Sequence, residues 1–459
     1  MALKHWSASV VVAIALGAPA ARAQGNYNSV ALGGRSALMG DTGIAIGTDG
    51  AAPFLNPATV VRVESTLALS VSILSLDVLH ASSWYAQGAD ISRISGNAVP
   101  STACLFFGLP QLYAPTDKDS RAGSQKLAAC FGTTELQQFD WVGQGFQTAT
   151  PGTIETSSVR WGWQRFAIGP TYAVNVTDAF ALGASLQGVF SNFSSFASVG
   201  SVSTDGTTAN VFEDGASGSD FGLTAVLGAT LAIDRTTFGA SIQSPDFSVY
   251  GHGNLSDYVT QAGTTTTYVG QGGFHGREPA RFGIGIAYQA PRVTFEIDGH
   301  LALADGHAIE LDMQGTELSG GASTQAALTR NTRFQPTVNV GAGVEYFTSK
   351  SLSLLGGVAT DFSAVDGLGA NAVAQSQVNR LLASFGVGSH TEAGTLIIGT
   401  QAYAGWGRML GYANAPAVAP TNVASFGLLF VLAGATNFRA IERTLDEMRK
   451  MVTPTTNHP

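Results

Sequence analysis

The chain has 459 residues, of which 45% are hydrophobic and 12% are charged, and it contains 56 glycines. Ordinary soluble domains carry about 25% charged residues and about 7% glycine, so this chain is too apolar to be disordered and too glycine-rich for a helical protein. The formal net charge of −9 argues against nucleic acid as a partner, because neutralising phosphates requires a basic surface.

The first residues have the pattern of a cleavable export signal. A short polar start precedes an apolar run over residues 9–18, and residues 21–23 (Ala-Arg-Ala) form a small-x-small cleavage site. The alternative, an N-terminal membrane anchor, needs about 20 apolar residues, and this run is shorter. We therefore predict a signal peptide over residues 1–23 and a mature start near Gln24.

Beyond residue 65 the dominant period of the sequence is two. Over residues 293–301, Phe295 and Ile297 alternate with Glu296 and Asp298, so one face of a strand is apolar and the other polar. No later stretch is apolar and long enough for a spanning helix. An exported, apolar chain of this kind predicts a closed transmembrane β-barrel.

The connections between the expected strands alternate between tight and long. Tight turns are expected at residues 176–178, 234–236, 290–292, 348–350 and 390–394. Longer polar or Gly/Ser/Thr-rich segments, expected as external loops, cover residues 194–220, 251–279, 305–333, 365–379 and 410–422. Short turns at one end and long connections at the other are typical of outer-membrane barrels, whereas a soluble sandwich has no reason to keep its long loops at one end.

Counting strands on this scheme gives eleven between Val159 and Phe438. Three more are expected at residues 66–76, 78–87 and 101–111, so the total is about fourteen, an even number as bacterial single-chain barrels require. Residues 112–155 are then expected to be an external loop.

The chain contains two cysteines, Cys104 and Cys130. Export permits a disulfide, and two cysteines allow one pairing. We expect this bridge to pin the loop after residue 111 back toward the barrel rim, with free thiols as the alternative.

Two segments do not fit the wall of the barrel (residues 65–438). Residues 24–64 are rich in glycine and alanine and lack a sustained period of two. Residues 439–459 begin with helical spacing, because Ile441, Leu445, Met448 and Val452 can share one face. We expect a short amphipathic tail in the periplasm, which can equally be a frayed helix without a defined role.

The segment before the first strand carries a resemblance to a known family. Residues 34–47 read GRSALMGDTGIAIG and residues 49–58 read DGAAPFLNPA. This glycine- and alanine-rich stretch with an acidic residue, followed by an Asn-Pro-Ala triplet, resembles the hatch of the FadL/OmpP1/TodX family of outer-membrane transporters. The matching stretch covers about one-tenth of the chain, and the strand and loop scheme extends the resemblance over most of the rest.

The resemblance implies a barrel of about 14 strands with the N-terminal segment, residues 24–64, as a hatch in its lumen. It also implies that hydrophobic molecules are captured outside and diffuse inward, with movement of the hatch and a lateral opening in the wall. Two features depart from the family pattern. A tail follows Phe438, the expected final-strand aromatic residue, and no long hydrophobic helix pair stands out in the external segments.

The triplet Asn56, Pro57 and Ala58 also has a reading of its own. Proline fixes φ and favours extended geometry in the preceding residue, and an asparagine amide can bond to neighbouring backbone groups. The triplet is therefore a candidate anchor of the hatch on the wall, or a turn that only starts the first strand.

Polar residues on one strand form the best candidate site. Glu296, Asp298 and His300 share a face, and Arg281 lies on the preceding strand. This lumen polar cluster can hold the hatch or orient a substrate headgroup, although an ordinary polar lumen wall is the simpler explanation. Strand spacing of these residues is weak evidence for a metal site, so we expect none.

No pattern of catalytic residues is recognisable, and we expect neither enzyme activity nor a cofactor. The glycine pairs Gly283/Gly285 and Gly341/Gly343 lack the third glycine of a dinucleotide loop and lie in strand-like runs. They are better explained as small positions where the wall packs against the hatch.

The hypothesis from sequence is passive transport of hydrophobic compounds, either long-chain fatty acids or aromatic hydrocarbons, across the bacterial outer membrane. Expected partners are these small molecules, the lipid and lipopolysaccharide of that membrane and the barrel-assembly machinery. The alternative function is a barrel of the same fold that serves as a binding or secretion platform through its tail. A secreted soluble β-domain is a third possibility.

Overall fold

The computed structural model describes residues 25–27, 29–86, 88–113, 120–147, 152–261, 263–369 and 371–438. The predicted signal peptide (1–23) and the predicted tail (439–459) lie outside these residues and stay predictions.

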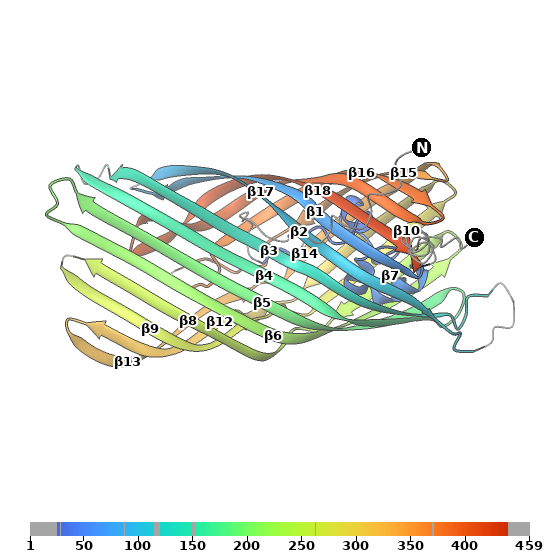
Figure 1. The fold of residues 1–459 in the computed structure, drawn as a ribbon, viewed down its shortest axis with the longest axis horizontal. Coiled ribbons are helices and arrows are strands. Elements are labelled where there is room, and N and C mark those ends of the chain that lie inside the picture. The colour runs from blue at the N-terminus through green and yellow to red at the C-terminus, as the bar shows by residue number, and fades with distance from the viewer. Residues whose placement is uncertain are drawn as a thin grey trace, which may run out of the picture.

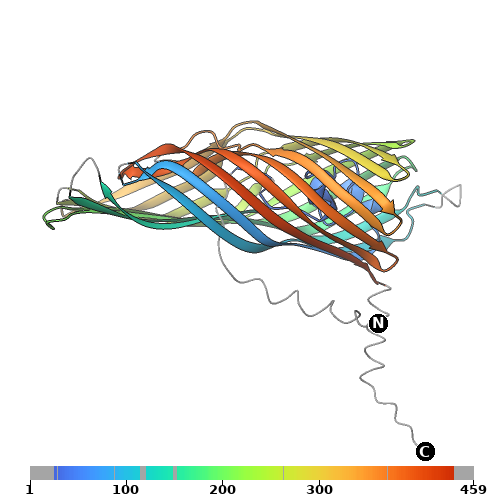
Figure 2. The ribbon, with the colours of Figure 1, turned by 90° about the horizontal axis from the view of Figure 1, so that it is seen from above.

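One antiparallel sheet forms a closed barrel (Figures 1 and 2). Strand β1 pairs with β2 on one side and with β18 on the other, so the first and last strands complete the ring. The strands are β1 (Thr66–Tyr85), β2 (Ala89–Leu109), β3 (Gln125–Gln147), β4 (Thr153–Asn175), β5 (Phe180–Ser203), β6 (Ala209–Ile233), β7 (Thr236–Gln243), β8 (Phe247–Gln261), β9 (Thr264–Gly276), β10 (Arg281–Ala290), β11 (Val293–Ala302), β12 (Asp305–Ser319), β13 (Ala322–Phe334), β14 (Thr337–Ser349), β15 (Leu352–Asp361), β16 (Ser376–Thr391), β17 (Gly394–Asn414) and β18 (Ala417–Asn437).

The eighteen strands occupy fourteen positions in the wall, because four positions are each filled by two consecutive strands: β7 with β8, β9 with β10, β11 with β12, and β13 with β14. Three of these four breaks contain a proline, namely Pro245, Pro279 and Pro336. Proline has no N–H to donate to the ladder and therefore interrupts a strand. The predicted fold class and the count of fourteen are confirmed.

The outward face of the wall has two zones. In β5 the outward side chains near the tight turn are apolar, such as Leu182 and Leu186, whereas Asn192 and Ser194 follow on the same face. Strand β6 shows the same change, from Leu227 and Leu231 to Ser219. An apolar outward band surrounds the barrel at the tight-turn end. The outward face of the other end, here called the polar zone, carries polar side chains interspersed with exposed apolar ones such as Phe196 and Val202.

The tight turns are where the sequence predicts them, between β4 and β5, β6 and β7, β10 and β11, β14 and β15, and β16 and β17. The prediction of long external loops is wrong for most of these segments. Strands continue through these segments and end in short turns such as 204–208 and 320–321. Their serine, threonine and glycine content reflects outward positions beyond the apolar band, and threonine suits a pleated strand well. Residues 362–369 and 371–375 are the exception, and they form an irregular connection between β15 and β16.

The start of the barrel also differs from the prediction. The two strands expected at residues 66–76 and 78–87 are replaced by one strand, β1 (Thr66–Tyr85), because the single residue between them cannot form a hairpin. The expected loop at residues 112–155 contains β3 and the beginning of β4. Cys104 in β2 and Cys130 in β3 lie opposite each other and are joined by a disulfide that links two wall strands.

The described residues before the first strand form three short helices: α1 (Arg35–Leu38), α2 (Ala52–Leu55) and the 3-10 helix η1 (Pro57–Arg62). Residues 25–27 and 29–64, here called the N-terminal segment, lie inside the barrel at the tight-turn end (Figure 1). Among the described residues, no helix is both long enough and apolar enough to cross a membrane.

Candidate functional site in the barrel lumen

Two wall carboxylates hold the middle of the N-terminal segment by its backbone. The Asp298 carboxylate accepts hydrogen bonds from the N–H groups of Gly43 and Ile44, at 2.7 and 2.8 Å. The Glu296 carboxylate accepts from those of Ala45 and Ile46, at 2.9 and 2.8 Å. Four successive donors are thus satisfied by two side chains that are two residues apart on β11. Hydrogen bonds to a charged acceptor contribute about 1.5–3 kcal/mol each, so this contact is a strong one.

Arg35 of α1 lies between two wall carboxylates. Its Nε donates to Glu345 at 2.8 Å, and its Nη1 lies 3.7 Å from Glu296. Nη1 also donates to the carbonyl oxygen of Ile46 at 2.8 Å, within the N-terminal segment. Burial lowers the pKa of Arg35, but Glu345 and Glu296 raise it by more, so the net shift is upward and the group stays charged.

Glycines in the wall leave room for the backbone of the N-terminal segment. A Cβ at Gly341 or Gly343 would collide with the carbonyl oxygen of Gly40 or of Met39. A Cβ at Gly283 would lie 2.6 Å from Ile44 Cδ1, and one at Gly285 would lie 3.0 Å from the nitrogen of Ala45. The prediction that these glycine pairs pack against the segment is confirmed. Inward-facing glycines outside those pairs have the same role: Gly239, Gly357, Gly386 and Gly399.

The Asn56-Pro57-Ala58 triplet lies where the N-terminal segment meets β6. Asn56 Nδ2 donates to the carbonyl oxygens of Ile44 at 2.6 Å and of Ala229 in the wall at 3.1 Å. Its Oδ1 accepts from the N–H of Ala58, which caps η1. Asn56 therefore closes the local turn and also bonds to the wall.

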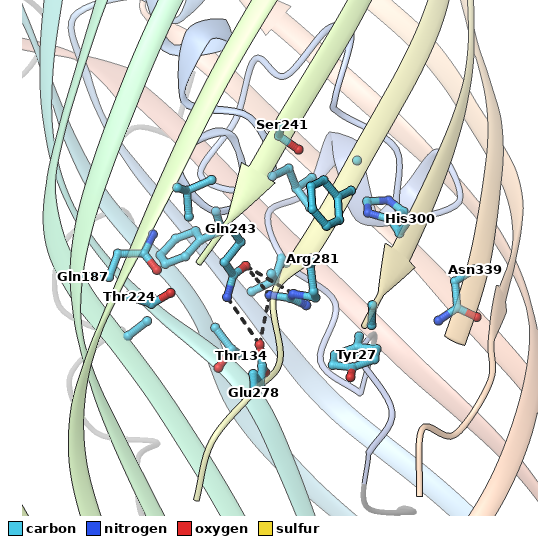
Figure 3. Close-up of a pocket in the computed structure, with 18 of the residues that line it drawn as sticks. Tyr27, Thr134, Gln187, Thr224, Ser241, Gln243, Glu278, Arg281, His300 and Asn339 are labelled. Carbon is cyan, nitrogen blue, oxygen red and sulfur yellow. Dashed lines mark hydrogen bonds and ion pairs between the residues drawn. The ribbon is translucent and has the colours of Figure 1, made fainter. Parts of the chain in front are cut away.

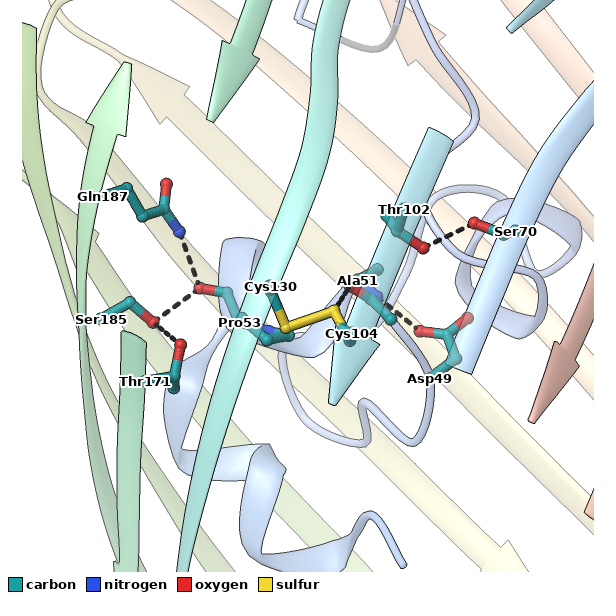
Figure 4. Close-up of a disulfide and its surroundings, with 11 residues drawn as sticks. Asp49, Ala51, Pro53, Ser70, Thr102, Cys104, Cys130, Thr171, Ser185 and Gln187 are labelled. Atoms are coloured by element: carbon teal, nitrogen blue, oxygen red, sulfur yellow. Dashed lines mark hydrogen bonds between the residues drawn. A yellow bond between two sulfur atoms is a disulfide. The ribbon is translucent and has the colours of Figure 1, made fainter. Parts of the chain in front are cut away.

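Further polar contacts join the N-terminal segment to the wall. The carbonyl oxygen of Pro53 accepts from Ser185 Oγ at 2.9 Å and from Gln187 Nε2 at 3.3 Å, beside the Cys104–Cys130 disulfide (Figure 4). On the opposite wall, Gln401 Nε2 donates to Asp41 at 3.2 Å. Burial raises the pKa of Asp41 to about 8.

The four residues of the predicted lumen polar cluster occupy two places. Glu296 and Asp298 hold the N-terminal segment, whereas Arg281 and His300 line a small cavity between that segment and the wall (Figure 3). There Arg281 lies 3.1 Å from Glu278 and stacks over the ring of Tyr27. The cluster is therefore not one site.

Acidic residues outnumber basic ones at the middle level of the lumen. Arg165 pairs with Asp246 and Glu278, both at 2.5 Å, and the indole N–H of Trp163 donates to Glu135. Asp246 lies in the break between β7 and β8, and Glu278 lies in the break between β9 and β10. Among the described residues, no group of three or more His, Cys, Asp or Glu side chains is placed to hold a metal ion.

The outer part of the lumen is lined by apolar side chains, which the sequence analysis did not single out. The first lumenal cluster is rich in aromatic rings, and Trp84 lies within 5.7 Å of the rings of Phe139, Trp141 and Tyr412. The second lumenal cluster includes Trp163, Phe193, Leu255, Phe274, Leu311 and Met313, all buried. The signal was present in the sequence, because Trp161 and Trp163 occupy alternate positions on the inward face of β4.

Solved structures with the same fold are known. The toluene transporter TodX of P. putida matches with a TM-score of 0.59 and 15% identity, covering 90% of this chain and 99% of that one. A Pseudomonas aeruginosa FadL homologue matches with a TM-score of 0.54 and 14% identity over 91% and 100% of the two chains. The Ralstonia pickettii toluene transporter TbuX has a TM-score of 0.52 and 14% identity over 90% and 100%. No family model and no curated protein matches the sequence. The chain therefore has the fold of the FadL-type hydrophobic-compound transporters.

Removing the two wall carboxylates should loosen the N-terminal segment. In the double variant Glu296→Ala/Asp298→Ala, the four N–H groups of residues 43–46 lose their acceptors. We expect hydrogen exchange at these amides to accelerate at least about tenfold, as the loss of one charged hydrogen bond already predicts. Asp312→Ala, at an outward carboxylate on β12, is the control. Unchanged exchange at residues 43–46 would contradict this role.

Adding one methyl group to an inward glycine should displace the same segment. Gly343→Ala places a Cβ against the backbone of Met39, whereas at the outward-facing Gly299 the nearest atom is 3.8 Å away. Overpacking of this kind costs about 1–3 kcal/mol. Exchange at the amides of residues 39–41 should therefore rise in Gly343→Ala and stay at the wild-type rate in Gly299→Ala, and equal behaviour of the two variants would refute the packing argument.

Proposed function

We propose that this protein is an outer-membrane conduit for hydrophobic molecules and that the N-terminal segment is its plug. The observation that carries the proposal is the apolar lining of the outer lumen, inside a barrel whose outward band is also apolar. Barrels that conduct water-soluble solutes have a polar interior. An apolar lining instead stabilises an apolar solute by about 25 cal/mol for each Å² of its surface removed from water.

The outward apolar band supports a location in a membrane. Exposed side chains such as Leu227, Ile284 and Phe295 surround the barrel at the level of the N-terminal segment. An open sheet edge is not tolerated in lipid, and the pairing of β1 with β18 removes that edge. The polar outward zone then stands outside the bilayer, on the side away from the tight turns, and raises the aromatic lumen above the membrane surface.

The contacts of the N-terminal segment support its role as a plug. It fills the lumen at the level of the apolar band, and its backbone bonds to β6, β11 and other wall strands. A solute that enters from outside reaches the two apolar clusters first and meets this segment afterwards. Passage inward therefore requires the segment, or part of it, to move. TodX and TbuX share the fold and are described as toluene transporters, which agrees with a hydrophobic cargo.

A positive charge in the outward band should prevent stable insertion. At the bilayer midplane an arginine costs about 2–4 kcal/mol, and near the interface about 0–1 kcal/mol. Leu227→Arg should lower the free energy of unfolding from phospholipid vesicles by the larger amount, and Ser219→Arg, on the same face of β6 in the polar zone, by the smaller. Equal costs in urea unfolding experiments would rule out a bilayer at this level.

The conduit itself is tested by uptake of radiolabelled naphthalene in cells that lack other barrels of this fold. Cells that express the chain should take it up several-fold faster than cells with an empty vector. Phe193→Asn places an amide among the buried rings of Trp163 and Phe274 and should lower the rate about tenfold, because an unpaired buried polar group costs about 1–3 kcal/mol.

The matched control is Phe196→Asn, on the same strand but on the outward face, which should leave uptake unchanged. If both variants transport at the wild-type rate, the apolar lumen is not the route. If the wild-type chain does not exceed the empty vector, the protein is not a conduit for this class of molecule.

A further inference from the structure

Three arginines lie at successive levels of the lumen, and each one is flanked by two carboxylates. At the inner level Arg35 lies between Glu296 and Glu345, and at the middle level Arg165 lies between Asp246 and Glu278. The third is Arg330 of β13, in the outer part of the barrel, which pairs with Asp214 of β6 and Asp257 of β8.

The outer triad has a regular geometry. Arg330 Nη1 donates to both oxygens of Asp214 at 2.8 Å, and Nη2 donates to both oxygens of Asp257 at 2.9 Å. Asp214 and Asp257 are directly opposite each other in the β6–β8 ladder, where like charges repel. One guanidinium thus donates hydrogen bonds to both carboxylates, and the three side chains together carry a net charge of −1.

The outer triad lies inside the lumen on the path to the apolar clusters. Strands β9 and β12 separate β13 from β8, so the Arg330 side chain reaches across their lumenal face. The Arg330 side chain is 9% exposed and those of Asp214 and Asp257 are 23% and 26% exposed, so a solute entering from outside meets the carboxylates. Leu255, two residues before Asp257 on β8, and Tyr268, on the neighbouring strand β9, belong to the second lumenal cluster.

At the deeper levels the arginines are paired with carboxylates as well. At the middle level Arg281 adds a second guanidinium, but it shares Glu278 with Arg165. At the inner level Arg35 forms ion pairs with both Glu296 and Glu345. Arg35, Arg165, Arg281 and Arg330 are therefore all paired with protein carboxylates, and at none of the three levels do these pairs leave an excess positive charge.

We propose that this lumen admits uncharged hydrophobic molecules and rejects hydrophobic carboxylates of the same size, and that Asp214, Asp257 and Arg330 set this selectivity at the outer level. The inference rests on the proposed conduit function and assigns its substrate class. A carboxylate on the solute meets an excess negative charge in a low-dielectric surrounding, where repulsion is much stronger than in water. An uncharged ring experiences only the apolar lining.

Three labelled compounds with the same ring system test this: naphthalene, 1-naphthalenemethanol and 1-naphthoate, which is an anion at pH 7. Uptake is measured above the empty-vector rate. The wild-type chain should transport naphthalene at least about tenfold faster than naphthoate. The neutral alcohol should resemble naphthalene, because it carries a polar group without the charge.

The variant Asp214→Asn/Asp257→Asn changes the net charge of the outer triad from −1 to +1. It should raise naphthoate uptake about tenfold and keep naphthalene within twofold of the wild-type rate, with Asp257→Asn alone in between. Asp205→Asn, in the exposed β5–β6 turn at the same end of the barrel, removes one charge outside the lumen and should change neither rate.

The outcomes separate the two proposals. Naphthoate uptake as fast as naphthalene uptake in the wild-type chain overturns the charge selectivity and leaves the conduit intact. An equal change of both compounds in the double variant also overturns it. If no compound exceeds the empty-vector rate, the conduit fails first. Heat-dependent migration on gels shows whether each variant is assembled. If the double variant is not assembled, the charge selectivity is tested by the ratio of naphthalene to naphthoate uptake in the wild-type chain and in Asp257→Asn.

Discussion

The contact between β11 and the N-terminal segment determines how the lumen of this barrel is organised. Four consecutive backbone N–H groups, from Gly43 to Ile46, need acceptors once they are removed from water, and Glu296 and Asp298 supply them. The wall has to come close enough for these bonds to form, and inward glycines such as Gly343 allow that approach. The carboxylates bring a charge that Arg35 partly offsets. A segment whose helices are all short is thereby held in one position.

Much of the fold follows from the sequence, because a period of two and tight turns are local properties. The eleven later wall positions follow from the spacing of the tight turns, and the inward direction of Glu296 and Asp298 follows from the alternation over residues 293–301. The early strands were misplaced because the alternation within residues 125–147 changes phase at the irregularity between Thr133 and Glu135. Inward residues are even-numbered before this point and odd-numbered after it, so no single period of two runs through the strand. The loop assignment failed for a related reason, since Ser/Thr-rich sequence describes a strand outside lipid as well as it describes a loop.

The candidate site was less predictable, because it depends on contacts between distant residues. Arg281 and His300 share a cavity with Tyr27 instead of completing a cluster with Asp298, and no local pattern encodes this. Arg330 meets Asp214, 116 residues away, only when the strands from β6 to β13 are assembled side by side. By contrast, the packing of Gly341 and Gly343 against the N-terminal segment is predictable from the sequence, since two small residues at inward positions indicate a close neighbour. The sequence predicts which side chains share one face of a strand, but it does not predict which side chains of distant strands meet across the lumen.

The position of the N-terminal segment has a consequence for how the protein acquires its structure. Asn26 bonds to the carbonyl oxygens of Asp361 and Val378, and the hydrogen bond from Ser384 to Leu38 spans 346 residues. The part of the chain that is synthesised first thus obtains its partners among the last strands to be made. It cannot reach its final place before the ring around it is nearly complete. Enclosure of the segment and closure of the barrel are therefore coupled late events. If the barrel closed too early, the N-terminal segment would be left outside the lumen.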